Sequence, residues 1–389
     1  MAIPDRFPFL SFSFDPSTLS PDIWMLLGEA MSKCQHLAGA PLKPEAAKSL
    51  ASVYLARGVA ATTAIEGNTL SATEVQQIVD KGSADVPESR TYLEREVQNV
   101  LGAIRELDAA LQLGERPQID VARLCSLNAK VLDGIPDKPE VVPGHIREHD
   151  VVAGTYKAPH WTEVPDLLER FVRWLEELRD GLDMRTREED RFVNAFLSAV
   201  LSHLYIAWIH PFGNGNGRLA RLVEVQILSE SGVVPLVATN LLSDHYNKTR
   251  DAYYLALNAA QKDIGAFVRY AARGFVDELR EQIAVVRREN VLIHWESYVH
   301  QIFKEQPRTQ TRDRQREVAL TMVTGAEVSP EALTDLSTSL ARQYATAGPR
   351  TPARDLNDLV KLGLFVKVGH RRFRARREII EAFIPPTFH

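Results

Sequence analysis

Residues 210–221 combine backbone and side chains that suit the chemistry of a polyphosphate. They read His-Pro-Phe-Gly-Asn-Gly-Asn-Gly-Arg-Leu-Ala-Arg and follow a strongly apolar segment with helical spacing. Gly213, Gly215 and Gly217 let the backbone adopt conformations that are closed to other residues, which brings N–H groups close to an anion. The helix expected to begin there would add its N-terminal N–H groups and its dipole. The stretch therefore predicts a phosphate-binding loop.

Three side chains in the same stretch support this interpretation. Arg218 and Arg221 lie three positions apart on the expected helix, so both guanidinium groups point to one side and can hold phosphate oxygens. His210 stands beside them, with a pKa suited to taking up a proton near neutral pH. Each feature alone has an ordinary interpretation, as a helix cap, a turn or a solvated face. It is their conjunction that indicates function.

The stretch resembles the signature of the Fic family, His-Pro-Phe-x-(Asp/Glu)-Gly-Asn-Gly-Arg-x-x-Arg, whose members mostly transfer AMP from ATP to a protein hydroxyl. The resemblance implies that His210 is the general base for a target Ser, Thr or Tyr, and that Phe212 anchors the loop in the core. It also implies an anion hole for the α-phosphate, formed by Gly215, Asn216 and Gly217. Arg218 and Arg221 would hold the β- and γ-phosphates.

One position departs from the family pattern. Where the family has an acidic residue that holds Mg²⁺ between phosphates, this chain has Asn214, whose neutral amide oxygen ligates Mg²⁺ more weakly. Three outcomes are open: weak AMP transfer, transfer from another donor of UMP or phosphate, or nucleotide binding without turnover. AMP transfer with ATP and Mg²⁺ is favoured, because the rest of the motif is in place and such transfer depends mainly on positioning and charge.

A second element lies near the N-terminus, where residues 62–68 read Thr-Thr-Ala-Ile-Glu-Gly-Asn. Taken alone, this is an ordinary helix end followed by an N-cap at Thr69 or Ser71. It also resembles the Fic inhibitory motif (Ser/Thr)-x-x-x-Glu-(Gly/Asn), with matching residues at Thr62, Glu66 and Gly67. The resemblance implies that Glu66 pairs with Arg221 and blocks a productive γ-phosphate. A carboxylate can compete with phosphate for one guanidinium because both offer bidentate geometry.

Two further regions match the family. Residues 143–160 predict a short hairpin, either a surface loop or the family's flap, in which Val151, Val152 and Tyr156 dock a target strand. Downstream, Tyr254 and Gln261 resemble the adenine-pocket positions, although tyrosine at helical spacing is more often simply core.

Apolar spacing predicts a mainly α fold, a Fic-type helical core with the small hairpin. The expected helices cover residues 21–36, 43–65, 71–81, 87–113, 119–132, 161–182, 188–209, 216–231, 244–260 and 264–304. The helix at 188–209 is apolar enough to be the buried centre. We expect an N-terminal region with the inhibitory helix, a catalytic core, a linker helix and a C-terminal domain. Their bounds are 1–110, 111–280, 281–305 and 306–389.

The C-terminal part differs in charge, because residues 303–389 hold 15 Lys and Arg against 10 Asp and Glu, in a chain of net charge −5. A Pro-started amphipathic helix at 351–363 precedes a hairpin around Gly369. This order resembles a winged helix-turn-helix. Its wing would present Arg371, Arg372, Arg374 and Arg376 to DNA phosphates, or the domain would dock a protein or a second copy of the chain.

The remaining composition narrows the class of protein. Two cysteines, Cys34 and Cys125, are too few for a disulfide framework and fit a reducing compartment. The first residues lack the pattern of a signal peptide, so we expect a cytoplasmic protein without a membrane partner. The favoured function is an AMP transferase acting on an unidentified protein, with itself and a homodimer as further partners. The rival is a nucleotide-sensing, DNA-binding regulator with a weak or inactive core.

Overall fold

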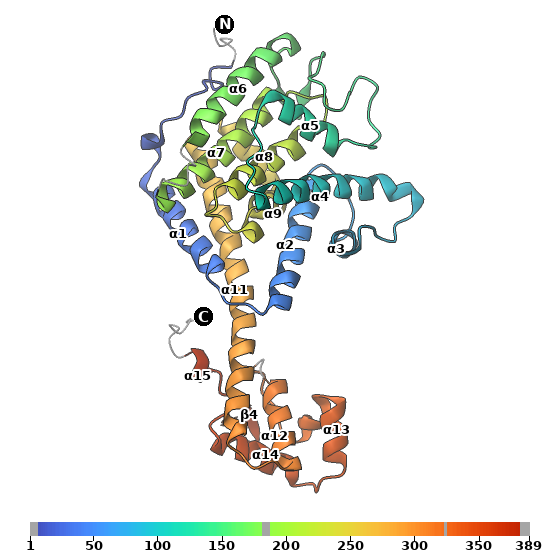
Figure 1. Ribbon diagram of the computed structural model, residues 1–389, viewed down its shortest axis with the longest axis vertical. Helices are drawn as coiled ribbons and strands as arrows, with labels where there is room; N and C mark the ends of the chain where they lie inside the picture. Colours follow the sequence, from blue (N-terminus) through green and yellow to red (C-terminus); the bar gives the residue numbers. More distant parts are fainter. Residues whose placement is uncertain (1–6, 181–186, 323–324, 382–389) are drawn as a thin grey trace. The chain divides into compact units, whose positions relative to one another are not determined.

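The computed structural model describes residues 7–180, 187–322 and 325–381, and it divides the chain into two compact units. Unit 1 ends at Ile283 and unit 2 begins at Ala284, within the long helix α11 (Ile264–Lys304). The predicted mainly α fold is confirmed (Figure 1). Leu182, the expected end of one helix, lies outside the described residues, as do residues 1–6 and 382–389 of the predicted terminal domains.

The described residues of unit 1 form helices and one small antiparallel hairpin. Short 3-10 turns, η1 (Pro16–Thr18), η2 (Glu88–Arg90), η3 (Trp161–Glu163) and η5 (Leu236–Ala238), join the longer elements. The helices are α1 (Pro21–Ala38), α2 (Pro44–Ala64), α3 (Ala72–Lys81), α4 (Thr91–Gln112), α5 (Val121–Val131), α6 (Val164–Arg179), α7 (Glu188–Ile209), α8 (Asn216–Glu230), α9 (Leu241–Lys248), α10 (Arg250–Ala259) and the first part of α11. The hairpin pairs β1 (Val152–Ala153) with β2 (Tyr156–Lys157).

The centre of unit 1 is the pair α7 and α8, which the other helices surround (Figure 1). The prediction that α7 is the buried central helix is confirmed, since Phe192, Phe196 and Leu204 are all fully buried. Among the described helices, α7 alone is long and apolar enough to cross a membrane, but 83% of its apolar window is buried inside the protein. Core helices share this property.

The turn after α2 is fixed to a neighbouring helix. Gly67 adopts a φ of 103°, which a helix cannot continue through. Residues other than glycine rarely tolerate that conformation. Asn68 then donates from Nδ2 to the carbonyl of Leu93 (2.9 Å) and to the carboxylate of Glu96 (2.8 Å), both on α4. The predicted N-cap at Ser71 is present and forms a capping box at the start of α3. The turn that follows Glu66 is therefore fixed to α4 and to the start of α3.

The prediction of one helix over residues 244–260 is wrong, because two helices, α9 and α10, meet at Thr249. Thr249 has φ −118° and ψ 39°, and its hydroxyl bonds to the carbonyl of His245 (2.8 Å) and to the Tyr270 hydroxyl (2.6 Å). A threonine side chain that bonds the backbone competes with helix continuation. No glycine or proline marks the break in the sequence.

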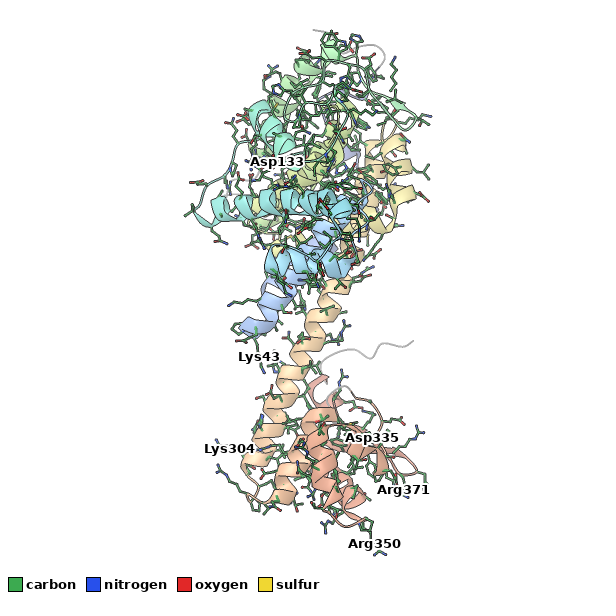
Figure 2. The ribbon with its side chains drawn as sticks, turned by 90° about the vertical axis from the view of Figure 1, so that its right-hand side faces the viewer. Lys43, Asp133, Lys304, Asp335, Arg350 and Arg371 are labelled. Atoms are coloured by element: carbon green, nitrogen blue, oxygen red, sulfur yellow. The ribbon has the colours of Figure 1, made fainter. Side chains whose placement is uncertain are left out.

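The described residues of unit 2 form the remainder of α11 and further helical elements. These are α12 (Gln310–Thr321), η7 (Glu331–Asp335), α13 (Thr338–Ala345), α14 (Thr351–Lys361) and α15 (Glu378–Glu381). The predicted hairpin pairs β3 (Phe365–Gly369) with β4 (Arg372–Ala375), and Val328 adds an isolated bridge to Phe373. The core of unit 2 includes Trp295, Leu356 and Phe365. The charged pair Arg314 and Asp355 (2.7 Å) is also buried in unit 2. Figure 2 labels Lys304 at the end of α11 and Arg371 in the hairpin turn.

Two glycines in helix interiors predict opposite effects of an added methyl group. A Cβ at Gly58 on α2 would overlap the side chain of Asn240, whereas a Cβ at Gly28 on α1 meets nothing within 4 Å. We expect Gly28→Ala to stabilise the protein by about 0.5–1 kcal/mol through helix propensity. Gly58→Ala should destabilise it by about 1–3 kcal/mol, because overpacking outweighs that gain. Thermal unfolding of both variants checks this, and a stabilised Gly58→Ala would contradict it.

Candidate functional site

The loop between α7 and α8 is fixed by its own side chains. His210 ends α7 in the left-handed conformation, with φ 50°, and Gly215 precedes α8 with φ 79°. Asn216 accepts from the Phe212 N–H through Oδ1 (3.0 Å) and donates to the Phe212 carbonyl through Nδ2 (2.8 Å). Phe212 is 1% exposed and anchors the loop, as the family resemblance implied. The side chain of Asn216 therefore fixes the loop. Its backbone N–H, at the start of α8, is one of the N–H groups that have no partner within the helix.

His210 is oriented for accepting a proton. Its Nδ1 lies 3.3 Å from the carbonyl of Ala207, which can only accept a hydrogen bond, so Nδ1 carries the proton and Nε2 is left as the acceptor. Burial lowers the pKa of His210 below its ordinary value, against an opposing effect of the Ala207 carbonyl. The neutral imidazole that a general base requires therefore predominates at neutral pH.

The ion pair between Glu66 and Arg221 is present in the structure. Arg221 donates from Nη2 to Glu66 Oε1 (2.6 Å) and to the carbonyl of Thr62 (2.9 Å). Glu66 also lies over the first turn of α8, because a Cβ built at Gly217 would overlap its carboxylate. The carboxylate thus occupies the place where a helix N-terminus and an arginine would hold phosphate.

The charge of Glu66 is stabilised by this placement. Desolvation alone would raise the pKa of Glu66, but the charges and hydrogen bond of Arg221, together with Arg218, lower it below its ordinary value. Arg221 is 1% exposed, and its Nε and Nη1 have no hydrogen-bond partner within the described chain. A buried guanidinium with unused donors retains the capacity to hold further anion oxygens.

The partner of Arg218 was not identified from the sequence. Arg218 donates from Nη1 to Glu96 Oε1 (2.6 Å), and Glu96 is itself fixed by Asn68. Burial raises the pKa of Glu96, and the nearby Glu66 carboxylate raises it further, whereas Arg218 lowers it. A glutamate on an amphipathic helix carries no sequence signal for this role, since most such residues face solvent.

Arg147 is a second residue that sequence reasoning missed. It is 3% exposed and donates to the carbonyls of His210 (2.8 Å), His149 (2.8 Å) and Pro159 (2.6 Å). Three main-chain segments therefore meet on one guanidinium group, which joins the loop of His210 to the hairpin segment. The one available signal was its place within the region that resembles the flap.

A cavity of about 510 Å³ opens beside these groups. Its lining includes Glu66, His210 and Gly217 together with Tyr254 and Gln261, the two residues expected in an adenine pocket. Tyr253, Leu257 and Asn258 of α10 also line it and were not expected. This volume is within the range of small-molecule and cofactor sites. The geometry suits a nucleotide with its phosphates at α8 and its base against α10.

The predicted flap residues divide into two groups. Val152 is 64% exposed on β1, and Val151 precedes it and accepts from the Ala158 N–H (3.3 Å). Tyr156 instead lines the cavity and donates from its hydroxyl to the carbonyl of Trp208 (2.7 Å). Tyr156 therefore anchors the hairpin, while the exposed strand β1 retains main-chain groups that an extended segment could pair with.

Asn214 does not present an oxygen ligand for Mg²⁺. Its Oδ1 accepts from the Gly215 N–H (2.6 Å) and lies 3.4 Å from Arg218 Nη2. Its Nδ2 donates to Asp137 Oδ2 (2.5 Å). Because the amide oxygen is occupied and its N–H₂ group faces a carboxylate, the side chain as placed does not fit a metal ligand. The Asp137 carboxylate, in the loop after α5, supplies a hard anionic oxygen in contact with this side chain.

Comparisons with known proteins agree with this geometry. The Fic/DOC family model matches residues 118–228, which include the loop and α8. The protein adenylyltransferase fic-1 of Caenorhabditis elegans is 28% identical over 236 residues, 59% of this chain and 42% of that protein. The protein adenylyltransferase Fic of Nematostella vectensis is 28% identical over 216 residues, 54% of this chain and 45% of that protein. The chain thus matches less than half the length of these relatives.

Solved structures share the fold. A Fic family protein from Desulfovibrio desulfuricans G20 has a TM-score of 0.55 at 21% identity and covers 93% of this chain and 98% of its own. A fragment of Fic-1 from C. elegans has a TM-score of 0.52 at 24% identity, over 68% of this chain and 73% of its own. Loop, cavity, family match and fold agree, and this chain therefore contains a domain of the Fic/DOC family at residues 118–228.

Proposed function

We propose that this protein transfers AMP from ATP to a hydroxyl group of a protein, and that Glu66 restrains the reaction. The observation that carries this proposal is the Glu66 carboxylate, which lies on Arg221 and over the first turn of α8, beside His210 in one cavity. A carboxylate held there marks a site with the charge and geometry for a phosphate.

The roles of the residues follow from their positions. The first-turn N–H groups of α8 stabilise the charge that develops on the α-phosphate, and the two arginines orient the remaining phosphates. Nε2 of His210 takes the proton of the incoming hydroxyl, whose oxygen bonds to the α-phosphorus while the bond to the β-phosphate breaks and pyrophosphate leaves. The exposed edge of β1 aligns the target segment. The relatives that are named protein adenylyltransferases support this reaction over others, and the target is an unidentified protein or the chain itself.

The proposed restraint follows from competition for one guanidinium group. Glu66 and a phosphate compete for Arg221, since the carboxylate takes an Nη2 donor and fills the space over Gly217. Removing the carboxylate frees that space and the donor of Arg221 that Glu66 occupies, while the hydrogen bond to the Thr62 carbonyl remains. Mg²⁺, which we include as the cofactor, would neutralise part of the phosphate charge during transfer.

A second function is favoured by an observation in unit 2. The order α12, Val328, α13, α14, β3 and β4 is what a winged helix requires, and α14 exposes Arg354, Asn357 and Lys361 on one face. These side-chain types pair with bases in the major groove. In the wing, carboxylates from other segments pair with Arg371 and Arg372, and Glu378 pairs with Arg374, whereas on α14 Lys361 pairs with Asp358 of the same helix (3.2 Å). We therefore propose α14 as the DNA-binding element.

We also propose that the protein is located in the cytoplasm. Cys34 is buried and Cys125 is partly exposed, and neither forms a disulfide. Free thiols are typical of a reducing compartment, where ATP is also available.

Intact-mass spectrometry after incubation with ATP and Mg²⁺ tests AMP transfer. We expect Glu66→Gly to accumulate an AMP adduct that the unaltered protein forms slowly, because the γ-phosphate can then reach Arg221. Adding His210→Ala should lower the rate by about 10²–10⁴-fold, the usual contribution of a general base. Glu115→Gly, an exposed glutamate outside the site, is the matched control. Absence of an adduct in Glu66→Gly despite nucleotide binding would favour the regulator or another donor.

The protonation state of His210 can be measured directly. Because burial lowers the pKa of His210, its imidazole should become protonated only as the pH falls below the ordinary histidine value of about 6.5. An NMR titration of histidine-labelled protein would show this, with the His210 resonance identified by its loss in His210→Ala. A midpoint above that value would contradict the neutral base.

Fluorescence anisotropy with labelled duplex DNA tests unit 2. We expect binding that weakens with salt, and Arg354→Ala/Lys361→Ala should cost about 1–3 kcal/mol of binding free energy. Arg287→Ala, an exposed arginine on α11, is the control for loss of charge. Lack of binding at low salt would leave a protein-docking or dimerising role for unit 2, and DNA binding altered by ATP without AMP transfer would support the rival regulator.

A further inference from the structure

The loop after α5 places a carboxylate against the phosphate-binding motif. Asp137 Oδ2 lies 2.5 Å from Asn214 Nδ2, although the two residues are 77 positions apart in the chain. The same loop packs on the motif at a second point, since a Cβ built at Gly213 would lie 3.0 Å from Val141 Cγ2. Asp137 is further oriented by the Lys138 N–H, which donates to its Oδ1 (2.8 Å). The juxtaposition therefore rests on more than one contact.

The orientation of the Asn214 amide is determined by its neighbours. Its oxygen accepts from the Gly215 N–H and faces Arg218 Nη2, both of which are donors, and its nitrogen faces Asp137, which only accepts. Turning the amide over would bring donor against donor and oxygen against oxygen. Asn214 is thus a spacer that links the arginine side of the site to the carboxylate of Asp137.

A buried guanidinium group near this carboxylate has an unused donor that suits the anionic oxygens of a ligand. Arg218 is 3% exposed, and its Nε has no hydrogen-bond partner in the parts of the chain that the structure describes. A phosphate held by Arg218 would lie near Asp137, and two anions without a cation between them repel each other. A divalent cation removes this repulsion, because Mg²⁺ commonly binds through one or two carboxylates and the phosphates of the substrate.

We propose that Asp137 supplies the carboxylate for the divalent cation of the nucleotide, in place of the acidic residue that position 214 lacks. This inference rests on the proposed function, because it assumes that a nucleotide occupies the cavity. It assigns to an exposed loop residue, outside the motif, the metal-binding role that the motif sequence does not provide. Asn214 then acts as a positioning residue that holds Asp137 through its amide nitrogen.

The test measures how much a metal ion strengthens nucleotide binding, independently of catalysis. Isothermal titration calorimetry with the α,β-methylene analogue of ATP, which cannot transfer AMP, is carried out on Glu66→Gly protein with Mg²⁺ and again with a chelator. The ratio of the two dissociation constants is the metal enhancement. Electron paramagnetic resonance with Mn²⁺ reports the bound metal directly.

Asp137→Asn should reduce the metal enhancement by at least about tenfold, as expected for the loss of a group that supports a metal site. It should also tighten binding in the presence of chelator, because a repulsive charge is removed. Asp137→Asn/Asn214→Asp, which moves the carboxylate to the family position, should restore the enhancement. Glu140→Gln, an exposed neighbour in the same loop, should leave it unchanged.

Three outcomes separate this inference from the proposed function. Loss of enhancement in Asp137→Asn with recovery in the double variant supports the metal role. An enhancement in Asp137→Asn equal to that of its parent would overturn the inference while leaving nucleotide binding intact. Failure of the folded Glu66→Gly protein to bind the analogue under either condition would overturn the proposed function, and the metal role with it.

Discussion

Two buried guanidinium groups at the start of α8 are the constraint around which unit 1 is organised. Arg218 is 3% exposed and Arg221 is 1% exposed, and a buried charge without a partner is strongly destabilising. Each therefore has a carboxylate from a distant element, Glu96 on α4 and Glu66 after α2. The charges that suit phosphate binding are thus the same charges that hold α2 and α4 against α8.

The two carboxylates differ in how easily they can be exchanged. The Glu96 side chain is 9% exposed and is further held by Asn68, so it remains with Arg218. The Glu66 side chain is 27% exposed at the edge of the cavity, and a ligand can replace it without leaving Arg221 unpaired. Under the proposed function, inhibition by Glu66 and binding of a phosphate are therefore alternative ways of neutralising one buried charge.

Backbone hydrogen bonds give the site its shape. The loop that carries His210 runs between two helices, and its carbonyls must be paired because the loop is largely buried. Arg147 donates hydrogen bonds to the carbonyls of His210 and of the hairpin segment. Asn128 donates to the Asn214 carbonyl (2.9 Å) and accepts from the Gly144 N–H (2.9 Å). Polar side chains with no direct chemistry thus determine where His210 and the edge of β1 lie.

Much of the helical fold and the chemistry of the motif can be derived from the amino-acid sequence. The bounds of α7 and α11 match the predicted ones, because the apolar residues of each helix extend over its whole length in the sequence. The glycines, His210 and both arginines lie within twelve consecutive positions, so their cooperation is a local property. The pair of Glu66 with Arg221, 155 positions apart, was expected only because a family motif names it.

Tertiary structure alone decided which other residues complete the site. Glu96 meets Arg218 across 122 positions, and Arg147 meets the His210 carbonyl across 63. The break at Thr249 likewise depends on Tyr270 from another helix. In the sequence, neither the spacing of apolar residues nor the side-chain type distinguishes these residues from solvent-exposed ones. Each acquires its role from a partner that only the folded chain brings within hydrogen-bond distance.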